Sequence, residues 1–399
     1  MSESMRPSRR NFLKTTAVTA TALSGVRGAR AEEPKAFPAL PMRKLGRSGI
    51  PVSVLNQGTA FRLTQRMLDF SYAQGTRYFD TADCYEGGGA EREIARWFER
   101  TGKRKEIFLV TKCHPTEGPR QMLEMVDARL EALKTNHIDL LFMHQLCDRE
   151  YPKGAEAWSK SAEYKETAEQ LKKSGKCRLV GFSIHHQLRA TALENAAAGG
   201  AVDAIMFKYD PRTKKNDEMN RAIDRCVKAG IGLIAMKTQS SARAFQSRWE
   251  KMKTDDITVQ QAVVKAVLSD ERLSGMTSHM VSFKMIEDNA AMARDAKPLA
   301  AADRELLEGL YASGPHRLCE RCGGACADAV GRPTALHDVA RFVMYHEVYG
   351  QRVRAREHYH GLPAEWVDLS AEELSRAQAA CADGLDYPAI FAKARRYFA

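Results

Sequence analysis

Apolar and polar residues are arranged in two alternating ways along this chain between about residue 51 and residue 293. Short, nearly continuous apolar runs rich in branched side chains take turns with longer segments in which apolar residues recur every three or four positions. The first pattern is typical of a parallel strand buried on both faces, and the second of an amphipathic helix. The predicted strands lie at residues 52–60, 77–82, 107–112, 138–144, 178–184, 204–209, 232–237 and 273–278.

Helical segments follow these strands one by one. They lie at residues 63–74, 90–100, 119–133, 164–173, 188–197, 216–228, 259–268 and 283–293. A doubly wound sheet is a competing fold, but the three glycines at 87–89 follow the second strand and lack the Gly-x-Gly-x-x-Gly spacing. Eight strand–helix alternations therefore predict an α/β fold, a (β/α)8 TIM barrel over residues 42–295.

The pattern changes after residue 300. Segments 336–349 and 388–398 carry helical spacing, and four of the nine cysteines lie in this part of the chain. We therefore expect residues 300–399 to form a C-terminal helical extension that contains cysteines.

The first 31 residues also differ from the rest. Residues 8–14, SRRNFLK, resemble the twin-arginine export signal, and Ala29-Arg30-Ala31 is a small-x-small cleavage site. The Thr- and Ala-rich run between them is far shorter than the ~20 residues of a membrane span. We expect residues 1–31 to be a removed signal peptide. The twin-arginine (Tat) export machinery would then be a partner, and the protein would be periplasmic or extracytoplasmic. No transmembrane anchor is expected.

The net charge of +11 raises the question of nucleic-acid binding. Lysine and arginine are scattered among acidic residues and are not grouped with aromatic ones, so we expect no nucleic-acid partner. With 44% hydrophobic residues, the chain can bury a substantial core.

Polar, proton-active residues end three consecutive predicted strands. Asp80 and Tyr85 follow the second strand, Lys112 ends the third, and His144 ends the fourth. A single lysine or histidine in such a place is most often solvated or caps a strand. In a TIM barrel, however, the C-terminal strand ends converge on one mouth that carries the active site. The sequence therefore predicts that these four side chains lie together.

These motifs resemble those of the aldo-keto reductases. FDTADCYEGGGAERE, FLVTK and DLLFMHQ are similar to the family's second, third and fourth strands, and RKLGRSGIPVS to its opening hairpin. The resemblance implies a hydride transfer to or from a carbonyl or alcohol, with Tyr85 as the proton donor. Because a nearby ammonium favours a phenolate, we expect Lys112, held by Asp80, to lower the tyrosine pKa from about 10. His144 would orient the carbonyl, and this chemistry requires no metal.

The resemblance also implies a nicotinamide cofactor, NADP or NAD. VGFSIHH is similar to the fifth-strand segment that holds the carboxamide, although Ile184 and Met206 stand where the family carries amide side chains. SGMTSHMVSFKMIEDN is similar to the segment that holds the adenosine phosphate and adenine. The predicted cofactor-binding residues are Ser183, Ser278, Asp288 and Asn289.

The C-terminal cysteines resemble the iron–sulfur segment of an exported subgroup of this family. Their spacing suits one [4Fe–4S] cluster, although Val330 stands where that subgroup has its fourth cysteine. A zinc site would suit the same ligands, and disulfides or idle thiols remain an alternative. The predicted metal ligands are Cys319, Cys322, Cys326 and Cys381.

We thus expect an exported NAD(P)-dependent oxidoreductase of the aldo-keto reductase type, acting on a small carbonyl or alcohol. Its cofactor would be loaded before export and held tightly. Two alternatives stay open. One is a barrel that binds or senses nucleotides without catalysis, favoured by Ile184 and Met206. The other is a periplasmic iron–sulfur electron-transfer protein with a redox partner.

Overall fold

The computed structural model describes residues 37–146, 151–152, 154–186, 188–239, 242–295, 297–313, 324–347, 350–381 and 384–398. The predicted signal peptide at residues 1–31 lies outside these ranges, as do Cys319 and Cys322.

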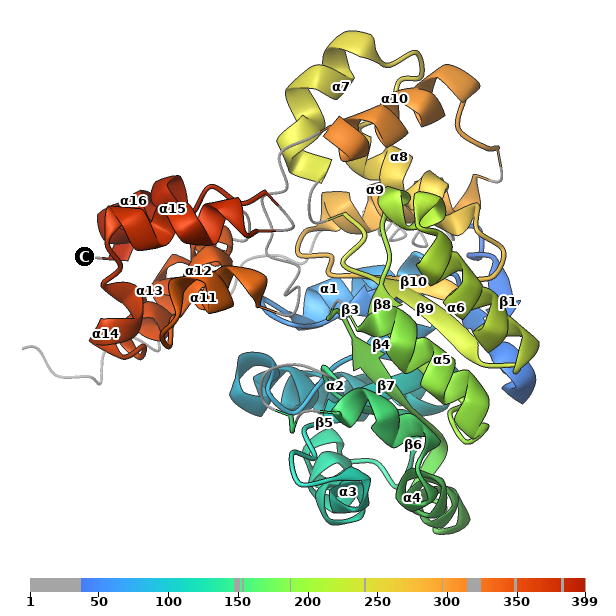
Figure 1. Cartoon of the computed structure of the whole chain (residues 1–399). Coiled ribbons are helices and arrows are strands. Elements are labelled where there is room, and N and C mark those ends of the chain that lie inside the picture. The colour runs from blue at the N-terminus through green and yellow to red at the C-terminus, as the bar shows by residue number, and fades with distance from the viewer. Residues whose placement is uncertain are drawn as a thin grey trace, which may run out of the picture. The chain divides into compact units, whose positions relative to one another are not determined.

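The eight predicted strands form a closed, parallel barrel (Figure 1). Its order is β10-β3-β4-β5-β6-β7-β8-β9, so that each strand pairs with its neighbours in sequence and the last closes on the first. The strands are β3 (Leu55–Gly58), β4 (Tyr78–Asp80), β5 (Phe108–Cys113), β6 (Ile138–Met143), β7 (Cys177–Ile184), β8 (Ala204–Lys208), β9 (Gly232–Met236) and β10 (Gly275–Ser278). The predicted TIM barrel is confirmed.

Helices surround this barrel, and all eight predicted ones are present. Several begin with a side chain that caps the first turn, such as Thr64, Ser161 and Thr258. The helices of the barrel are α1 (Gln65–Ala73), α2 (Gly89–Thr101), α3 (Met122–Leu133), α4 (Ala162–Lys173), α5 (Arg189–Gly199), α6 (Asp217–Lys228), α7 (Gln246–Met252), α8 (Val259–Leu268) and α9 (Phe283–Arg294). Short 3-10 turns are η1 (Gly46–Ser48), η2 (Tyr85–Gly88), η3 (Lys103–Glu106), η4 (Pro119–Gln121), η5 (Ala155–Lys160), η6 (Pro211–Lys215) and η7 (Ala242–Phe245).

A β-hairpin closes the N-terminal end of the barrel. Strands β1 (Met42–Lys44) and β2 (Pro51–Ser53) pair antiparallel, as the opening segment predicts. Leu45 is fully buried in the same cluster as Phe108 and Leu179, which lie near the starts of their strands. A side chain at Gly232 would meet Leu45 at 2.4 Å, so this glycine allows the hairpin to seal the barrel.

The barrel interior is apolar at its base and polar at the C-terminal mouth. Tyr78, Val110 and Phe142 belong to the inner cluster, and side chains alternate along each strand. Because of that alternation, Asp80 and Lys112 point inward one step above Tyr78 and Val110. The fold therefore brings the polar strand ends to one place.

The C-terminal part of the chain is helical, as expected. Helix α10 (Ala301–Ser313) packs against α8, and the following helices share a hydrophobic cluster of their own. These are α11 (Ala325–Val330), α12 (Leu336–Glu347), α13 (Arg352–His360), α14 (Ala364–Val367), α15 (Ala371–Ala379) and α16 (Tyr387–Phe398) (Figure 1). Within the described ranges, none of the helices is long and apolar enough to span a bilayer.

Candidate active site at the mouth of the barrel

A buried ion pair lies at the ends of β4 and β5. Lys112 Nζ donates to Asp80 Oδ1 at 2.7 Å and to the carbonyl oxygen of Thr81 at 2.8 Å. The Lys112 and Asp80 side chains are only 1% and 4% exposed. Because both charges are withdrawn from water, each depends on the other for compensation.

The hydroxyl of Tyr85 lies next to this ion pair. Lys112 Nζ is 3.5 Å from Tyr85 Oη and 4.9 Å from the centre of the ring. Tyr85 begins the turn η2, which continues through Gly87 and Gly88, both with positive φ. Backbone of this kind favours glycine, so the glycine run sets the turn that holds the phenol at the mouth.

His144 completes the predicted group. It follows β6 directly, and its backbone N–H donates to the carbonyl oxygen of Cys113 at 2.8 Å. Its ring meets the ring of Tyr85 edge to face, with centroids 5.6 Å apart. Burial, and then the charge of Lys112, hold the pKa of His144 well below its ordinary value, so the imidazole is neutral. The structure therefore brings all four predicted residues together.

The pKa of Tyr85 moves opposite to the expected direction. Burial raises it well above its ordinary value, and the negative charge of Asp80 raises it further. Lys112 does not overcome this, because its charge is compensated by Asp80 at 2.7 Å. The prediction of an acidified phenol is wrong. The site instead keeps Tyr85 protonated, which leaves it able to donate a proton.

Three further polar residues at this mouth were not predicted as site residues. Asp83 Oδ1 lies 3.3 Å from His114 Nδ1, and Cys84 Sγ lies 3.7 Å from His144 Nδ1. The His114 and His144 rings have centroids 4.4 Å apart. His114 comes directly after β5, so the rule that located Lys112 and His144 could also have found it.

The fifth-strand segment places one predicted cofactor contact at the mouth. Ser183 is buried near the end of β7, and its Oγ accepts the backbone N–H of Gln145 at 3.0 Å. Ile184 is part of the large hydrophobic core, whereas Met206 lies inside the barrel. Of Ser183, Ile184 and Met206, only Ser183 thus offers a polar group, and Met206 offers an apolar surface inside the barrel.

The eighth-strand segment brings Ser278 and Asn289 together with Gln239. Ser278 Oγ donates to Gln239 Oε1 at 2.8 Å, and Asn289 Nδ2 donates to Ser278 Oγ at 3.0 Å. Gln239 Nε2 donates to Asn289 Oδ1 at 3.0 Å, which closes the triangle. Asp288 is apart from it and pairs with Lys284 one turn earlier in the same helix. Gln239, which follows β9, was not among the cofactor-binding residues predicted from the sequence.

A histidine follows β10 directly. His279 Nδ1 accepts the backbone N–H of Ala60 at 3.1 Å, and its ring lies against the ring of Phe61 at an angle of 40°, with centroids 3.9 Å apart. Burial lowers the pKa of His279 to about 4, so the ring is neutral and Nε2 carries the hydrogen. The backbone of Phe61 and of Gly58 also hydrogen-bonds to this ring. Thr277 Oγ1 is buried and has no hydrogen-bond partner among the described residues.

Two of the four predicted metal ligands lie in the described tail. Cys326 is buried in the tail's hydrophobic cluster, and Cys381 packs against the same cluster. The Cys326 thiol lies 3.3 Å from the Tyr387 hydroxyl, and Cys381 Sγ accepts the backbone N–H of Leu385 at 3.4 Å. Helices α11 and α15 pack together, so the segments that carry these cysteines are neighbours.

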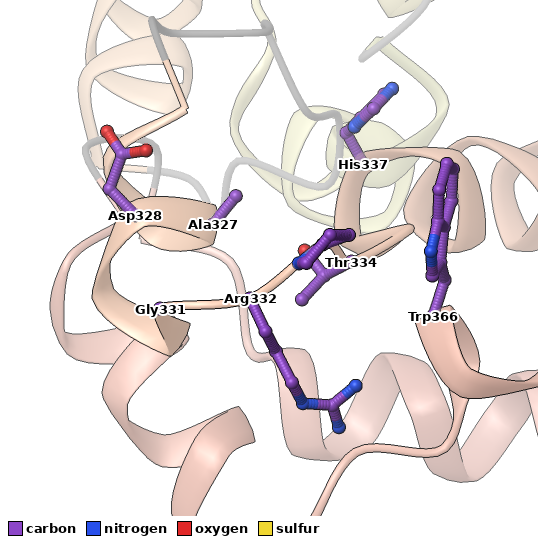
Figure 2. A pocket seen from close by; sticks show the side chains of 8 residues that line it. Ala327, Asp328, Gly331, Arg332, Thr334, His337 and Trp366 are labelled. Atoms are coloured by element: carbon purple, nitrogen blue, oxygen red, sulfur yellow. The ribbon is translucent and has the colours of Figure 1, made fainter.

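The tail also contains a shallow hollow of about 590 Å³ (Figure 2). Arg332 on its wall is already engaged, since its guanidinium pairs with Glu373 and donates to the carbonyl oxygens of Glu365 and Asp368. None of the predicted catalytic or cofactor-binding residues lines this hollow, whose walls are Ala327, Asp328, Gly331, Arg332, Pro333, Thr334, His337 and Trp366.

Comparison with known proteins gives one consistent family. A model described as "Aldo/keto reductase family" matches residues 53–295, which is more than half of the chain. The chain is 28% identical over 194 residues to the "Aldo-keto reductase yakc [NADP(+)]" of Schizosaccharomyces pombe, covering 43% of this chain and 53% of that protein. It is 31% identical over 183 residues to the "Aldo-keto reductase str7" of Strobilurus tenacellus, covering 44% and 48%. It thus spans about half the length of these curated relatives.

Solved structures share the fold. An aldo-keto reductase from Klebsiella pneumoniae in complex with NADPH has a TM-score of 0.55 and 22% identity, covering 69% of this chain and 96% of that one. The aldo-keto reductase AKR11C1 from Bacillus halodurans, in its holo form, has a TM-score of 0.55 and 21% identity, covering 68% and 96%.

Proposed function

The chain belongs to the aldo/keto reductase family, and from this premise we propose that it is an NADP(H)-dependent oxidoreductase acting on a small carbonyl or alcohol. The observation that carries the proposal is the position of Lys112, which lies 2.7 Å from the Asp80 carboxylate and 3.5 Å from the Tyr85 hydroxyl. A protonated phenol backed by a fixed ammonium can give up a proton and then hold the negative charge that remains.

Tyr85 is the proposed proton donor. In the reducing direction, a new bond to hydrogen forms at the carbonyl carbon and the carbonyl electron pair moves to oxygen. That oxygen takes the proton of Tyr85, and the Lys112 ammonium at 3.5 Å stabilises the phenolate. In the oxidising direction the phenolate takes the proton back from the alcohol.

His144 positions the carbonyl. The imidazole is neutral and buried, and its ring stands edge to face with Tyr85 at 5.6 Å. A neutral imidazole can donate one N–H to the carbonyl oxygen without adding a second positive charge beside Lys112. Hydride transfer and proton transfer both require an aligned carbonyl group, so His144 contributes by orienting the substrate carbonyl.

Several side chains at the mouth fit a nicotinamide dinucleotide, which supplies the hydride when it is bound. The hydroxyl of Thr277, which has no hydrogen-bond partner among the described residues, offers a donor to phosphate or ribose oxygens. Ser183 offers a hydroxyl near the end of β7, and Met206 offers an apolar surface inside the barrel for the nicotinamide. The preference for NADP is supported by the relatives from S. pombe and K. pneumoniae, whose descriptions name NADP(+) and NADPH.

Exchange of Tyr85 for phenylalanine tests this function. We expect Tyr85→Phe to lower kcat for NADPH-dependent reduction of a panel of aldehydes and ketones by about 10²–10⁴-fold, the usual contribution of a positioned acid. Binding of NADPH, followed by fluorescence, should be unchanged. Retained turnover would exclude Tyr85 as the donor. A wild-type protein that binds NADPH and reduces no carbonyl would instead support the nucleotide-sensing alternative, which the apolar Met206 favours.

We also propose that the protein is exported by the twin-arginine route and that its tail holds one [4Fe–4S] cluster. Support for the cluster comes from Cys326 and Cys381, which pack against one hydrophobic cluster although they are far apart in sequence. Anaerobically purified protein should contain iron and acid-labile sulfide, and Cys322→Ser should lose both. Zinc in place of iron, or no metal, would overturn the cluster. A redox partner follows only if the cluster is present.

A further inference from the structure

Four potential metal ligands converge at the mouth of the barrel. They are Asp83, Cys84, His114 and His144, and one ligand atom from each lies within 4.8 Å of all the others. We propose that these residues bind a divalent transition-metal ion, with Zn²⁺ as the best match. The aldo/keto reductase chemistry proposed above does not use such an ion, and the binding does not depend on that function.

The spacing of the ligand atoms suits a tetrahedral zinc ion. Bonds of about 2.0–2.3 Å at tetrahedral angles place neighbouring ligand atoms roughly 3.3–3.6 Å apart. His114 Nδ1 lies 3.3 Å from Asp83 Oδ1, and Cys84 Sγ lies 3.7 Å from His144 Nδ1. The other pairs of ligand atoms lie within 4.8 Å of one another, so side-chain rotations would bring all four atoms around one centre.

The chemistry of the donors points to zinc as well. One sulfur, two imidazole nitrogens and one carboxylate oxygen form a mixed set that zinc accepts, whereas Mg²⁺ and Ca²⁺ prefer oxygen alone. Zinc binding would displace the proton of the Cys84 thiol to solvent as the metal–sulfur bond forms. Cys84 is exposed, so an ion can reach the site from the mouth.

The ligands stand on rigid parts of the fold. Asp83 N–H donates to the carbonyl oxygen of Lys112 at 3.2 Å, and Cys84 N–H donates to Asp83 Oδ1 at 2.7 Å. His114 and His144 each follow the end of a barrel strand. Arg129 lies 4.0 Å from Asp83 Oδ2, which leaves Oδ1 facing His114.

Metal binding is compatible with the proposed positioning role of His144. Ligation through Nδ1 fixes the tautomer and leaves Nε2 as an N–H donor, so a bound ion would hold the ring in a donor orientation. The ion would then be a structural element beside Tyr85.

Titration of the full-length, reduced protein with Co²⁺ and Zn²⁺ tests the proposal. Tetrahedral Co²⁺ bound to a thiolate gives a charge-transfer band and intense visible d–d bands, and Zn²⁺ should displace it. Because the tail cysteines can also bind metal, the informative quantity is the difference between wild type and variants. Cys84→Ser and His114→Ala should each remove one equivalent of metal or weaken it by at least about 100-fold, more than the loss of an outer-shell partner causes.

Cys177→Ser serves as the matched control, because Cys177 is a buried thiol at the start of β7 and is not part of the group. It should retain the full number of bound ions. The metal should also raise the melting temperature of wild type and not that of His114→Ala. Circular dichroism checks that wild type, Cys84→Ser and His114→Ala are all folded. If the three folded proteins bind the same number of metal ions with the same affinity, the proposal is overturned.

Discussion

Lys112 Nζ and Asp80 Oδ1 lie 2.7 Å apart in an ion pair that is almost completely enclosed by the mouth of the barrel. The pair fixes the position of the lysine, and the Asp80 carboxylate offsets part of the positive charge that would otherwise acidify Tyr85. Burial and the negative charge of Asp80 accordingly raise the pKa of Tyr85. The site therefore keeps the Tyr85 phenol protonated and holds the Lys112 ammonium next to the oxygen on which the phenolate charge would form.

Removal of one partner from this pair should be costly. We expect Lys112→Met to lower the free energy of unfolding by about 3–5 kcal/mol at neutral pH, because it leaves the Asp80 carboxylate buried without a counter-charge. The loss should shrink as the pH falls and Asp80 takes up a proton. Urea unfolding followed by circular dichroism measures this, with Lys105→Met at an exposed position as the control. Equal stability of the two variants would show that the pair is not buried in solution.

Glu91 should make stability depend on pH. Burial raises its pKa from 4.5 to about 7, although it accepts a hydrogen bond from Thr111 at 2.6 Å and pairs with Arg129 at 3.2 Å. Between these two pKa values the folded state binds more protons than the unfolded state, so stability falls as the pH rises through this window.

The size of this effect can be measured with Glu91→Gln. Across the window, wild type should lose about 3 kcal/mol of unfolding free energy through this group, and the variant should not, because the amide does not ionise. Glu99→Gln, at an exposed position, should behave like wild type. A stability difference between Glu91→Gln and wild type that stays constant from pH 4.5 to pH 7 would contradict the raised pKa.

Gly181 should not tolerate a side chain. A Cβ atom there would lie 1.9 Å from the backbone oxygen of Ala204 on the neighbouring strand, which cannot move without opening the barrel. We expect Gly181→Ala to destabilise the protein by several kcal/mol or to prevent folding. Gly309→Ala is a matched control in helix α10, where a Cβ meets nothing within 4 Å. It should raise stability by about 0.5–1 kcal/mol, since alanine favours a helix. Thermal unfolding of both variants checks the contrast.

His279 should contribute to cofactor affinity. Its Nε2 is buried beside the backbone of Phe61 and Gly58, so a phosphate or ribose oxygen would compete with these groups for the ring N–H. We expect His279→Ala to weaken NADPH binding by about tenfold, the worth of one hydrogen bond to a charged group. Fluorescence titration measures the dissociation constant, with His137→Ala as a control outside the site. Unchanged affinity would remove His279 from the cofactor site.

The barrel could be predicted from the sequence because parallel strands buried on both faces leave nearly continuous apolar runs. All eight strands were placed in this way, whereas the opening hairpin was expected from the resemblance of RKLGRSGIPVS to the family's hairpin. Helix α7 was not predicted, because its seven residues bury only Trp249 and show no apolar stripe.

The membership of the candidate site was predictable in part, and its electrostatics were not. Strand ends identified Asp80, Lys112 and His144, since every one of them ends or follows a strand. The direction in which the pKa of Tyr85 shifts depends on how closely Asp80 approaches Lys112 and on how much water is excluded from the site. Neither quantity follows from the spacing of residues along the sequence. The sequence did not single out Cys84, because its proximity to His144 arises only when the segments that follow β4 and β6 meet at the mouth of the barrel.

The pH profile of kcat/KM for NADPH-dependent carbonyl reduction tests the central claim most directly. Because the pKa of Tyr85 is raised above its ordinary value of about 10, the donor remains protonated through neutral and mildly alkaline pH. We expect kcat/KM to stay level on the alkaline side up to about pH 9, and we expect no comparable rate in Tyr85→Phe. A basic limb centred near neutral pH that disappears in Tyr85→Phe would instead show a phenol acidified by Lys112 and would contradict the account.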